Sequence, residues 1–308
     1  MIEIENVSKR YGSVWALEDV SLRMEGSGIL GLLGQNGAGK TTLINILTGY
    51  LAPTSGRALL DGHDPLMEPV EAKRRLGYLP EQPPLYDEMT VREYLRFVAA
   101  LKGVAAKAIP AHVDEVMELT GLTSMRGRLL GHLSKGFRQR AGMAQALCGD
   151  PDVLVLDEPT VGLDPRQITE IRALIHTLGK NHTILFSSHI LSEVQQLCDH
   201  VVILDQGQVK LDAALAQLSA PEDVTVLLTV DAPEAAILGR LKQLEGVRRA
   251  TVQPAPRPGR TSVQLQFHRE PEPERRLFAL LSGMNIPILH LSRVGDSLEQ
   301  VFLNVISQ

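Results

Sequence analysis

The chain has 308 residues, of which 44% are hydrophobic, and its net charge is −5 with an isoelectric point of about 6.0. This composition is typical of a globular protein with room for two domains. The acidic balance argues against a basic face that grips nucleic acid, and no apolar run approaches the ~20 residues that span a bilayer. The acidic start of the chain is unlike a signal peptide. A function at a membrane would therefore need another chain to supply the spanning helices.

The first informative motif follows the predicted strands at 2–32. The segment 34–41, Gly-Gln-Asn-Gly-Ala-Gly-Lys-Thr, fits the phosphate-binding loop pattern G-x-x-x-x-G-K-[ST]. A buried strand is predicted before it, and a helix after it at 42–47. Such a loop surrounds an anion with backbone N–H groups, and the helix N-terminus adds its positive dipole end. The alternative, a glycine-rich turn that matches by chance, is disfavoured by these flanking elements.

Two side chains of this loop carry the chemistry. Lys40 is predicted to reach the β- and γ-phosphates of a nucleotide, and the Thr41 hydroxyl to be a ligand of Mg²⁺. The residues predicted to contact the nucleotide are Gly34, Asn36, Gly37, Ala38, Gly39, Lys40, Thr41 and Thr42.

The middle of the chain predicts an α/β core with a helical insertion. Short strands are expected at 57–61 and 75–79, and a helical segment runs from 90 to 149. That segment begins with Thr90-Val91-Arg92-Glu93, a capping-box sequence. Strand and helix then alternate, which favours a doubly wound sheet. The expected elements are 152–156, 167–178, 183–186, 191–197 and 201–204.

The second chemical motif is an apolar run, 153–156, that ends in Asp157 and Glu158. A buried parallel strand has this sequence character, and α/β sheets bind ligands at the carboxyl ends of their strands. Asp157 is predicted to hold Mg²⁺ through water, and Glu158 to accept a proton from an attacking water. Alone, the motif fits equally well a strand that runs into an acidic turn; the phosphate-binding loop favours the catalytic interpretation.

Six elements in this order resemble an ABC-type ATPase subunit, the nucleotide-binding half of an ABC transporter. The resemblance covers residues 1 to about 217 and implies a P-loop NTPase core with a helical subdomain at about 82–150. The elements are Tyr11, the loop 34–41, the signature-like segment 133–140 (Leu-Ser-Lys-Gly-Phe-Arg-Gln-Arg), the strand and carboxylates 153–158, Asp164 in Gly-Leu-Asp-Pro, and His189.

The resemblance implies ATP and Mg²⁺ as cofactors and a second ATPase subunit as partner. Two copies would hold two ATP molecules head to tail, with Ser134 and Gly136 of one copy facing the nucleotide of the other, and Asp164 beside that interface. His189 would contact the γ-phosphate, and Tyr11 would stack on adenine. Ser134 also fits a helix N-cap, and Tyr11 also fits a half-buried aromatic at a strand end.

Two segments depart from the family pattern. The signature has Lys135 and Phe137 where the family often has glycine and glutamine, although Ser134 and Gly136 are kept. After Pro80, Glu81 occupies the usual place of a metal-facing glutamine, and Gln82 comes one residue later. Either side chain can be a ligand of Mg²⁺, so the choice between them stays open.

The sequence pattern changes beyond about residue 220, where Pro221 marks a predicted linker. The following segment, 221–308, has the order βαββαβ, which suggests a small α+β, ferredoxin-like unit. Its strands are expected at 224–230, 247–252, 262–267 and 286–291, and its helices at 233–244, 273–281 and 297–305. The tail 296–303 resembles the end of subunits that serve ABC-2-type exporters. A regulatory or dimer-stabilising role and a passive appendage are both compatible with this segment.

The favoured interpretation is an ATPase subunit that powers export through a separate integral membrane permease. It would lie at the cytoplasmic face of the membrane, attached through that permease, with no nucleic-acid partner. A soluble ABC ATPase that remodels nucleic acid or ribosomes is the main alternative; the single ATPase unit, the acidic balance and the absence of a heptad run disfavour it. A small-molecule phosphotransferase would have no use for Ser134, Asp164 and His189.

Overall fold

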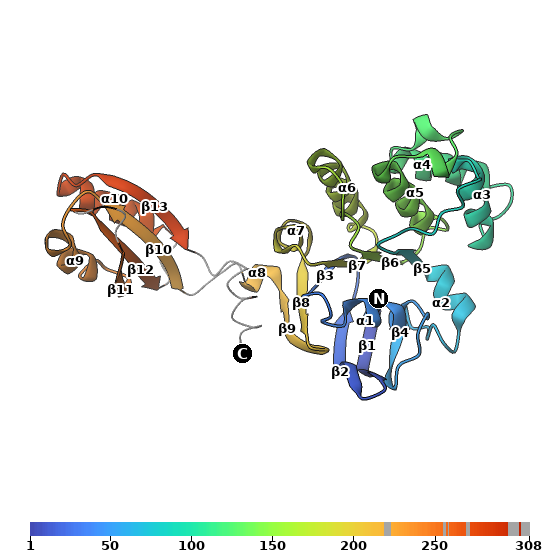
Figure 1. The fold of residues 1–308 in the computed structure, drawn as a ribbon, viewed down its shortest axis with the longest axis horizontal. Coiled ribbons are helices and arrows are strands. Elements are labelled where there is room, and N and C mark those ends of the chain that lie inside the picture. Colours follow the sequence, from blue (N-terminus) through green and yellow to red (C-terminus); the bar gives the residue numbers. More distant parts are fainter. Residues whose placement is uncertain (219–222, 255–256, 258, 269–271, 295–301, 303–308) are drawn as a thin grey trace. The chain divides into compact units, whose positions relative to one another are not determined.

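The computed structural model describes residues 1–308 except 219–222, 255–256, 258, 269–271, 295–301 and 303–308. The chain divides into two compact units, Met1–Leu215 and Ala216–Gln308 (Figure 1). Each unit has its own sheet and its own hydrophobic core. The predicted linker around Pro221 lies outside the described residues, as does nearly all of the predicted helix at 297–305.

A six-stranded sheet forms the centre of the first unit. Five neighbouring strands are parallel, and the last strand, β9, pairs antiparallel with β8 at the edge. The three strands β3, β6 and β7 are buried along their whole length, which explains their near-continuous apolar sequences. In spatial order the strands are β5 (Leu76–Leu79), β6 (Val153–Asp157), β7 (Thr183–Ser188), β3 (Gly28–Leu33), β8 (His200–Asp205) and β9 (Gln208–Ala214).

A second, antiparallel sheet of three strands covers α1 (Lys40–Leu47) on the other side. Its order is β2 (Val14–Met24), β1 (Ile2–Tyr11) and β4 (Ser55–Leu60). One hydrophobic cluster joins all three layers, with Ile4 from this sheet, Leu43 from α1 and Leu185 from the central sheet. The first helical turn after the phosphate-binding loop is therefore held between two sheets.

Three helices and two 3-10 turns lie between β5 and β6, where the sequence predicts a helical segment. The capping box is present, because Thr90 Oγ1 accepts from the Glu93 N–H and the Glu93 carboxylate accepts from the Thr90 N–H. The short helix α2 and the edge strand β9 were missed by sequence reasoning. The remaining helices of the first unit are α2 (Pro69–Arg75), α3 (Val91–Leu101), α4 (Ile109–Leu119), the 3-10 turns Thr123–Met125 and Leu130–His132, α5 (Lys135–Leu147), α6 (Pro165–Leu178) and α7 (Leu191–Leu197). The short helix α8 (Leu215–Leu218) begins at the last residue of the first unit and continues into the second.

In its described residues, the second unit has an antiparallel sheet of four strands, with helices α9 and α10 packed into the same core. Its element order is βαββαβ, as the sequence pattern predicts. Its core follows the alternation of β10, whose Val226, Leu228 and Val230 are fully buried in the same hydrophobic cluster as Phe267. The elements are β10 (Asp223–Val230), α9 (Glu234–Lys242), β11 (Val247–Gln253), β12 (Thr261–His268), α10 (Pro273–Gly283) and β13 (Ile288–Val294), in the sheet order β11-β12-β10-β13.

None of the helices in the described part combines the length and apolar character that crossing a bilayer requires. The two cysteines, Cys148 and Cys198, are buried free thiols.

Candidate nucleotide-binding site

The candidate site lies at the carboxyl edge of the central sheet. Three neighbouring strands end there in the order β6, β7, β3, and Leu33 of β3 is in register with Ser188 of β7. Asp157 closes β6 in register with Ser187, and the phosphate-binding loop leaves β3 beside them. Residues from distant parts of the sequence thus meet where parallel sheets bind ligands.

The glycines of the loop are required by close packing and by backbone conformation. A Cβ on Gly34 would collide with the Leu204 carbonyl, and one on Gly39 would lie 2.6 Å from the Ala16 carbonyl oxygen. Gly39 also has a φ of 107°, in the region that side chains rarely adopt, directly before α1. The loop is thus pressed against its surroundings on one side and leaves its exposed side, including Asn36, for a ligand.

Lys40 opens α1 and turns its side chain back into the loop. Its ammonium group donates to the Gly34 carbonyl at 2.6 Å and to the Gln35 carbonyl at 3.3 Å. The side chain is buried, and burial lowers the pKa of Lys40, while the nearby charges of Glu158 and Asp157 oppose that effect. The loop therefore presents a largely desolvated positive charge next to two carboxylates, which suits a phosphate chain.

Asp157 is held in one orientation by its neighbour on β7. The Ser187 hydroxyl donates to Asp157 Oδ1 at 2.6 Å. Burial raises the pKa of Asp157, the Ser187 hydrogen bond opposes this, and the charge of Glu81 raises it further. Glu81 and Gln82 are both exposed, and the charge of the Glu81 carboxylate acts on Asp157.

Glu158 stands in a strained turn and faces His189. Its φ is 48°, a left-handed conformation that is uncommon outside glycine, and its N–H donates to the Ser187 hydroxyl at 3.1 Å. Nδ1 of His189 lies 2.9 Å from both carboxylate oxygens of Glu158. Burial raises the pKa of Glu158, and the His189 hydrogen bond opposes this increase. The partly buried carboxylate of Glu158 thus lies at the same edge of the central sheet as Lys40.

A buried network behind these residues was not predicted from the sequence. Glu193 of α7 is fully buried, and it accepts hydrogen bonds from the Thr160 hydroxyl at 2.8 Å and the Ser188 hydroxyl at 3.0 Å. Arg172 donates to its other oxygen at 3.0 Å. The network ties the turn after Glu158 to the strand end before His189. The available signal was the helical spacing of Glu193 from the apolar Leu197.

Ser134, Gly136 and Asp164 form a separate cluster. Ser134 is the N-cap residue of α5, although its side chain accepts no capping hydrogen bond, and Asp164 caps α6 by accepting from the Gln167 N–H at 2.9 Å. A Cβ on Gly136 would lie 2.5 Å from the Gln167 side chain, so these two segments are packed together. Within the described ranges, no hydrogen bond joins the cluster to residues 34–42.

Two further predicted positions lie at the surface. Tyr11 ends β1, has 51% of its surface exposed, and has the Lys9 ammonium 5.4 Å above its ring. Thr41 and Thr42, which follow Lys40, are exposed and half-buried respectively. These positions leave the side chains accessible to a ligand that lies on the loop.

A magnesium ion fits this donor set together with a nucleotide. No group of three or more His, Cys, Asp or Glu in the described part is arranged to hold a metal by itself. Mg²⁺ differs from other metals because it is usually held by one or two carboxylates together with substrate phosphates. The Asp157 carboxylate is fixed, desolvated and close to the Glu81 charge, so a cation here would relieve the repulsion between them.

Comparison with known proteins agrees with the fold and the loop. Residues 17–161 match the family model described as "ABC transporter". The ABC transporter ATP-binding protein NatA of Bacillus subtilis is 39% identical over 228 residues, which cover 72% of this chain and 93% of NatA. The linearmycin resistance ATP-binding protein LnrL of the same organism is 29% identical over 99% of this chain and 98% of LnrL.

A solved structure of an ATP-binding subunit of an ABC transporter superposes with a TM-score of 0.66 at 30% identity, over 71% of this chain and 91% of that chain. The fold is thus that of a P-loop NTPase with mixed α/β sheets. The chain belongs to the ABC transporter family of ATP-binding proteins. It is the ATP-binding subunit of a transporter and an ATPase.

Proposed function

We propose that this chain hydrolyses ATP in a head-to-tail pair of subunits and thereby drives export through a separate membrane permease. The observation that carries the proposal is the convergence of Lys40, Asp157 and the Glu158–His189 pair at one edge of the sheet. Phosphoryl transfer to water requires three parts: a positively charged loop, a carboxylate in a fixed orientation, and a second carboxylate that can act on the attacking water.

Each group has a defined task in this proposal. The loop N–H groups and Lys40 hold the phosphates and take up negative charge, and Glu158 orients or deprotonates the attacking water. Mg²⁺, bound by Thr41, Asp157 and Glu81 or Gln82, supplies charge neutralisation at the phosphate oxygens. His189 faces Glu158 at 2.9 Å and is proposed to contact the γ-phosphate and keep the water in place.

A second copy of the chain is proposed to complete each site. Ser134 is exposed at the start of α5, where the positive end of the helix can face an anion, and no hydrogen bond among the described residues brings it to the loop of its own chain. Packing against Gln167 fixes Gly136 in that segment. Ser134 and Gly136 of one subunit would thus cover the nucleotide of the other, with Asp164 beside the contact and Tyr11 stacked on adenine.

The permease is proposed to dock in an apolar groove of the first unit. This groove has a volume of about 700 Å³ and lies between α2, α3 and the segment after β5. Its aromatic residues form a cluster, with ring centroids of Tyr86 and Tyr94 5.6 Å apart and those of Tyr86 and Phe97 5.7 Å apart. Leu101 in the same lining is 70% exposed, and such a groove suits the apolar face of a helix.

Export and membrane attachment rest on the relatives. The name of LnrL ties that protein to resistance against linearmycin, and LnrL matches this chain along almost its whole length. Removal of a toxic compound is the simplest transport that gives resistance. The subunit would then lie at the cytoplasmic face of the membrane, held by its permease. Nucleic acid is not expected as a partner, because the chain is acidic.

The domain arrangement is proposed as 1–217 for the ATPase and 221–308 for a ferredoxin-like accessory domain. The βαββαβ order and the antiparallel sheet support the second assignment. NatA is matched over nearly its whole length by less than three quarters of this chain, which supports an ATPase unit that works without the accessory domain. That domain is proposed to regulate the transporter or to stabilise the pair of subunits.

The composite site is tested by comparing Ser134→Arg with Lys40→Ala. Ser134→Arg should abolish hydrolysis and leave ATP affinity of the isolated subunit nearly unchanged, because the side chain acts on the partner's nucleotide. Lys40→Ala should weaken ATP binding itself. Binding of a fluorescent ATP analogue and steady-state phosphate release measure the two effects. An equal loss of affinity in both variants would show that Ser134 does not act across a dimer.

A further inference from the structure

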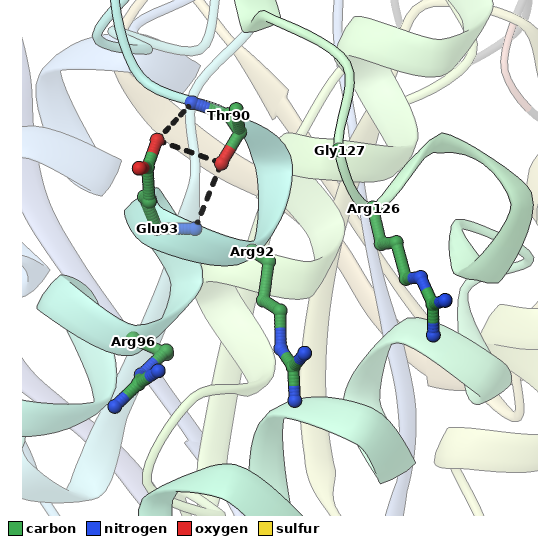
Figure 2. Close-up of a pocket in the computed structure, with 6 residues that line it drawn as sticks. All are labelled: Thr90, Arg92, Glu93, Arg96, Arg126 and Gly127. Atoms are coloured by element: carbon green, nitrogen blue, oxygen red, sulfur yellow. Dashed lines mark hydrogen bonds between the residues drawn. The ribbon is translucent and has the colours of Figure 1, made fainter.

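A cavity of about 360 Å³ in the first unit contains none of the residues assigned to the nucleotide site. It lies where the first turns of α3 meet the loop after the turn Thr123–Met125 (Figure 2). Three of its lining side chains are arginines, which is an unusual density of positive charge in an acidic chain. The lining residues are Thr90, Arg92, Glu93, Arg96, Arg126 and Gly127.

The backbone holds these arginines together. The Arg92 N–H donates to the Arg126 carbonyl at 3.0 Å, and the Val91 N–H donates to the Arg128 carbonyl at 3.1 Å. Both hydrogen bonds fasten the loop to the start of α3. Arg96 follows Arg92 by four positions, so the two share one face of the helix. In Figure 2 the side chain of Arg92 lies between those of Arg96 and Arg126.

The protein neutralises only part of this charge. Glu93, the carboxylate in the lining, is already used by the capping box, where it accepts from the Thr90 N–H at 2.9 Å and the Thr90 hydroxyl at 2.7 Å. Arg92 has Asp114 at 3.5 Å, and its Nε is buried without a hydrogen-bond partner in the described part.

The other two arginines are not paired with a carboxylate. Across the described ranges, neither Arg96 nor Arg126 has an acidic partner, and both are exposed. Two carboxylates, Glu93 in the lining and Asp114 beside Arg92, accompany the three guanidinium groups of the lining, so positive charge is in excess. The Gly127 N–H, in the same lining, donates to no acceptor among the residues described.

We propose that this cavity binds a phosphate group, carried by an anionic lipid headgroup or by a soluble phosphate compound. Guanidinium groups bind phosphate through paired N–H donors in a fixed plane, and a free backbone N–H adds a neutral donor. A phosphate group has enough oxygens to accept from two guanidinium groups and the Gly127 N–H together, whereas a carboxylate has only two oxygens. The ligand would join α3 to the loop 126–128 and stiffen this helical part of the subunit.

The test uses the full-length protein saturated with Mg²⁺ and ADP, so that the phosphate-binding loop is occupied. The lipid source is probed by flotation with phosphatidylcholine vesicles, with and without phosphatidic acid. The soluble source is probed by phenylglyoxal labelling of arginines, mapped by mass spectrometry, with and without inorganic pyrophosphate. Arg166, which is 90% exposed at its side chain, serves as the internal reference for labelling.

Binding to phosphatidic acid vesicles, or protection of Arg96 and Arg126 by pyrophosphate, would support the proposal and identify the source. The double variant Arg96→Gln/Arg126→Gln should weaken binding to the vesicles, or the protection of the remaining Arg92 by pyrophosphate, at least about tenfold. Arg128→Gln, on the same loop but outside the lining, should not. ATP hydrolysis should be equal in both variants, which confirms that they are folded. If neither probe distinguishes the double variant from the wild type, the cavity is not a phosphate site.

Discussion

The two units of this chain differ in the kind of polar side chain that they bury. The first unit buries the charged side chains of Lys40, Asp157, Glu158 and Glu193. In the described part of the second unit, the buried polar residues are hydroxyl groups that are satisfied locally: Thr229 and Ser262 lie 3.0 Å apart, and Thr261 donates to the Ala232 carbonyl at 2.7 Å. Both units fold around ordinary apolar cores, and only the first also contains desolvated charge in the part that the structure describes.

This difference indicates that the chemistry takes place in the first unit. A buried charge destabilises a fold unless it is paired, so a cluster of such charges persists where chemistry uses it. The second unit has no such cluster among its described residues. Mutations test this difference: if changes in the two units had the same effect on ATP turnover or ATP affinity, the units would not differ in function.

The largest expected effect comes from Glu158→Gln. The amide keeps the shape of the side chain but cannot accept a proton from water, so turnover should fall by about 10²–10⁴ while ATP affinity is kept. The matched control is Glu234→Gln, which changes an exposed carboxylate of the second unit and should leave turnover unchanged. Steady-state phosphate release and nucleotide binding measure both variants. Near-normal hydrolysis by Glu158→Gln would remove this residue from the mechanism.

The next effect compares two fully buried phenylalanines. Phe186 of β7 and Phe267 of β12 are among the largest fully buried side chains, one in each unit, and replacing either with Ala should cost about 3–5 kcal/mol of stability. Only Phe186→Ala should reduce ATP affinity, because Phe186 directly precedes Ser187 beside Asp157. Calorimetry and nucleotide titration check this. A matching loss of affinity in folded Phe267→Ala would show that the second unit supports the site.

A smaller effect separates Glu81 from Gln82. Glu81→Ala should lower Mg²⁺-dependent turnover about tenfold, which is typical of groups that orient a metal's ligands, and Gln82→Ala should lower it less. The expectation rests on the charge of Glu81, which acts on Asp157. Turnover is measured over a magnesium titration for both variants. A larger loss in Gln82→Ala would assign the metal-facing position to Gln82.

The smallest effect is on stability. Burial raises the pKa of Asp157, so the folded state binds this proton more tightly than the unfolded state and loses stability as pH rises through the raised pKa. Asp157→Asn should therefore raise the melting temperature of the nucleotide-free protein at pH 7, by about 2–4 °C per kcal/mol gained. The gain should shrink at acidic pH, where wild-type Asp157 is protonated. A gain independent of pH would point to a cause other than charge burial.

Much of the site was predictable because its signals are local. The loop 34–41 shows its glycines at fixed spacing, the strand before Asp157 is an unbroken apolar run, and the capping box needs only Thr90 and Glu93. These features depend on neighbours within a few residues, and the structure contains the loop, the strand and the cap where they were expected.

The parts that could not be predicted depend on long-range neighbours. Glu193 resembles a surface residue of a short helix until α7 is packed against Thr160 and Ser188. Strand β9 was missed although its sequence, Gln-Val-Lys-Leu-Asp-Ala-Ala, alternates polar and apolar residues, which is a local signal of a half-buried strand; only its place at the sheet edge depends on distant pairing with β8. The clustering of Arg92 and Arg126 likewise depends on backbone hydrogen bonds between segments that are distant in the sequence.

The position of Lys40 has a consequence for which ions the loop can retain. Its ammonium group already has the carbonyl groups of Gly34 and Gln35 as partners. Two of its three N–H donors are therefore engaged, and an incoming anion meets the one that remains. Chloride is a single atom with one charge, so it cannot contact this donor and the N–H groups along the loop at the same time. A phosphate chain engages the ammonium and the loop together, and the loop should thus reject the abundant simple anions of a cell.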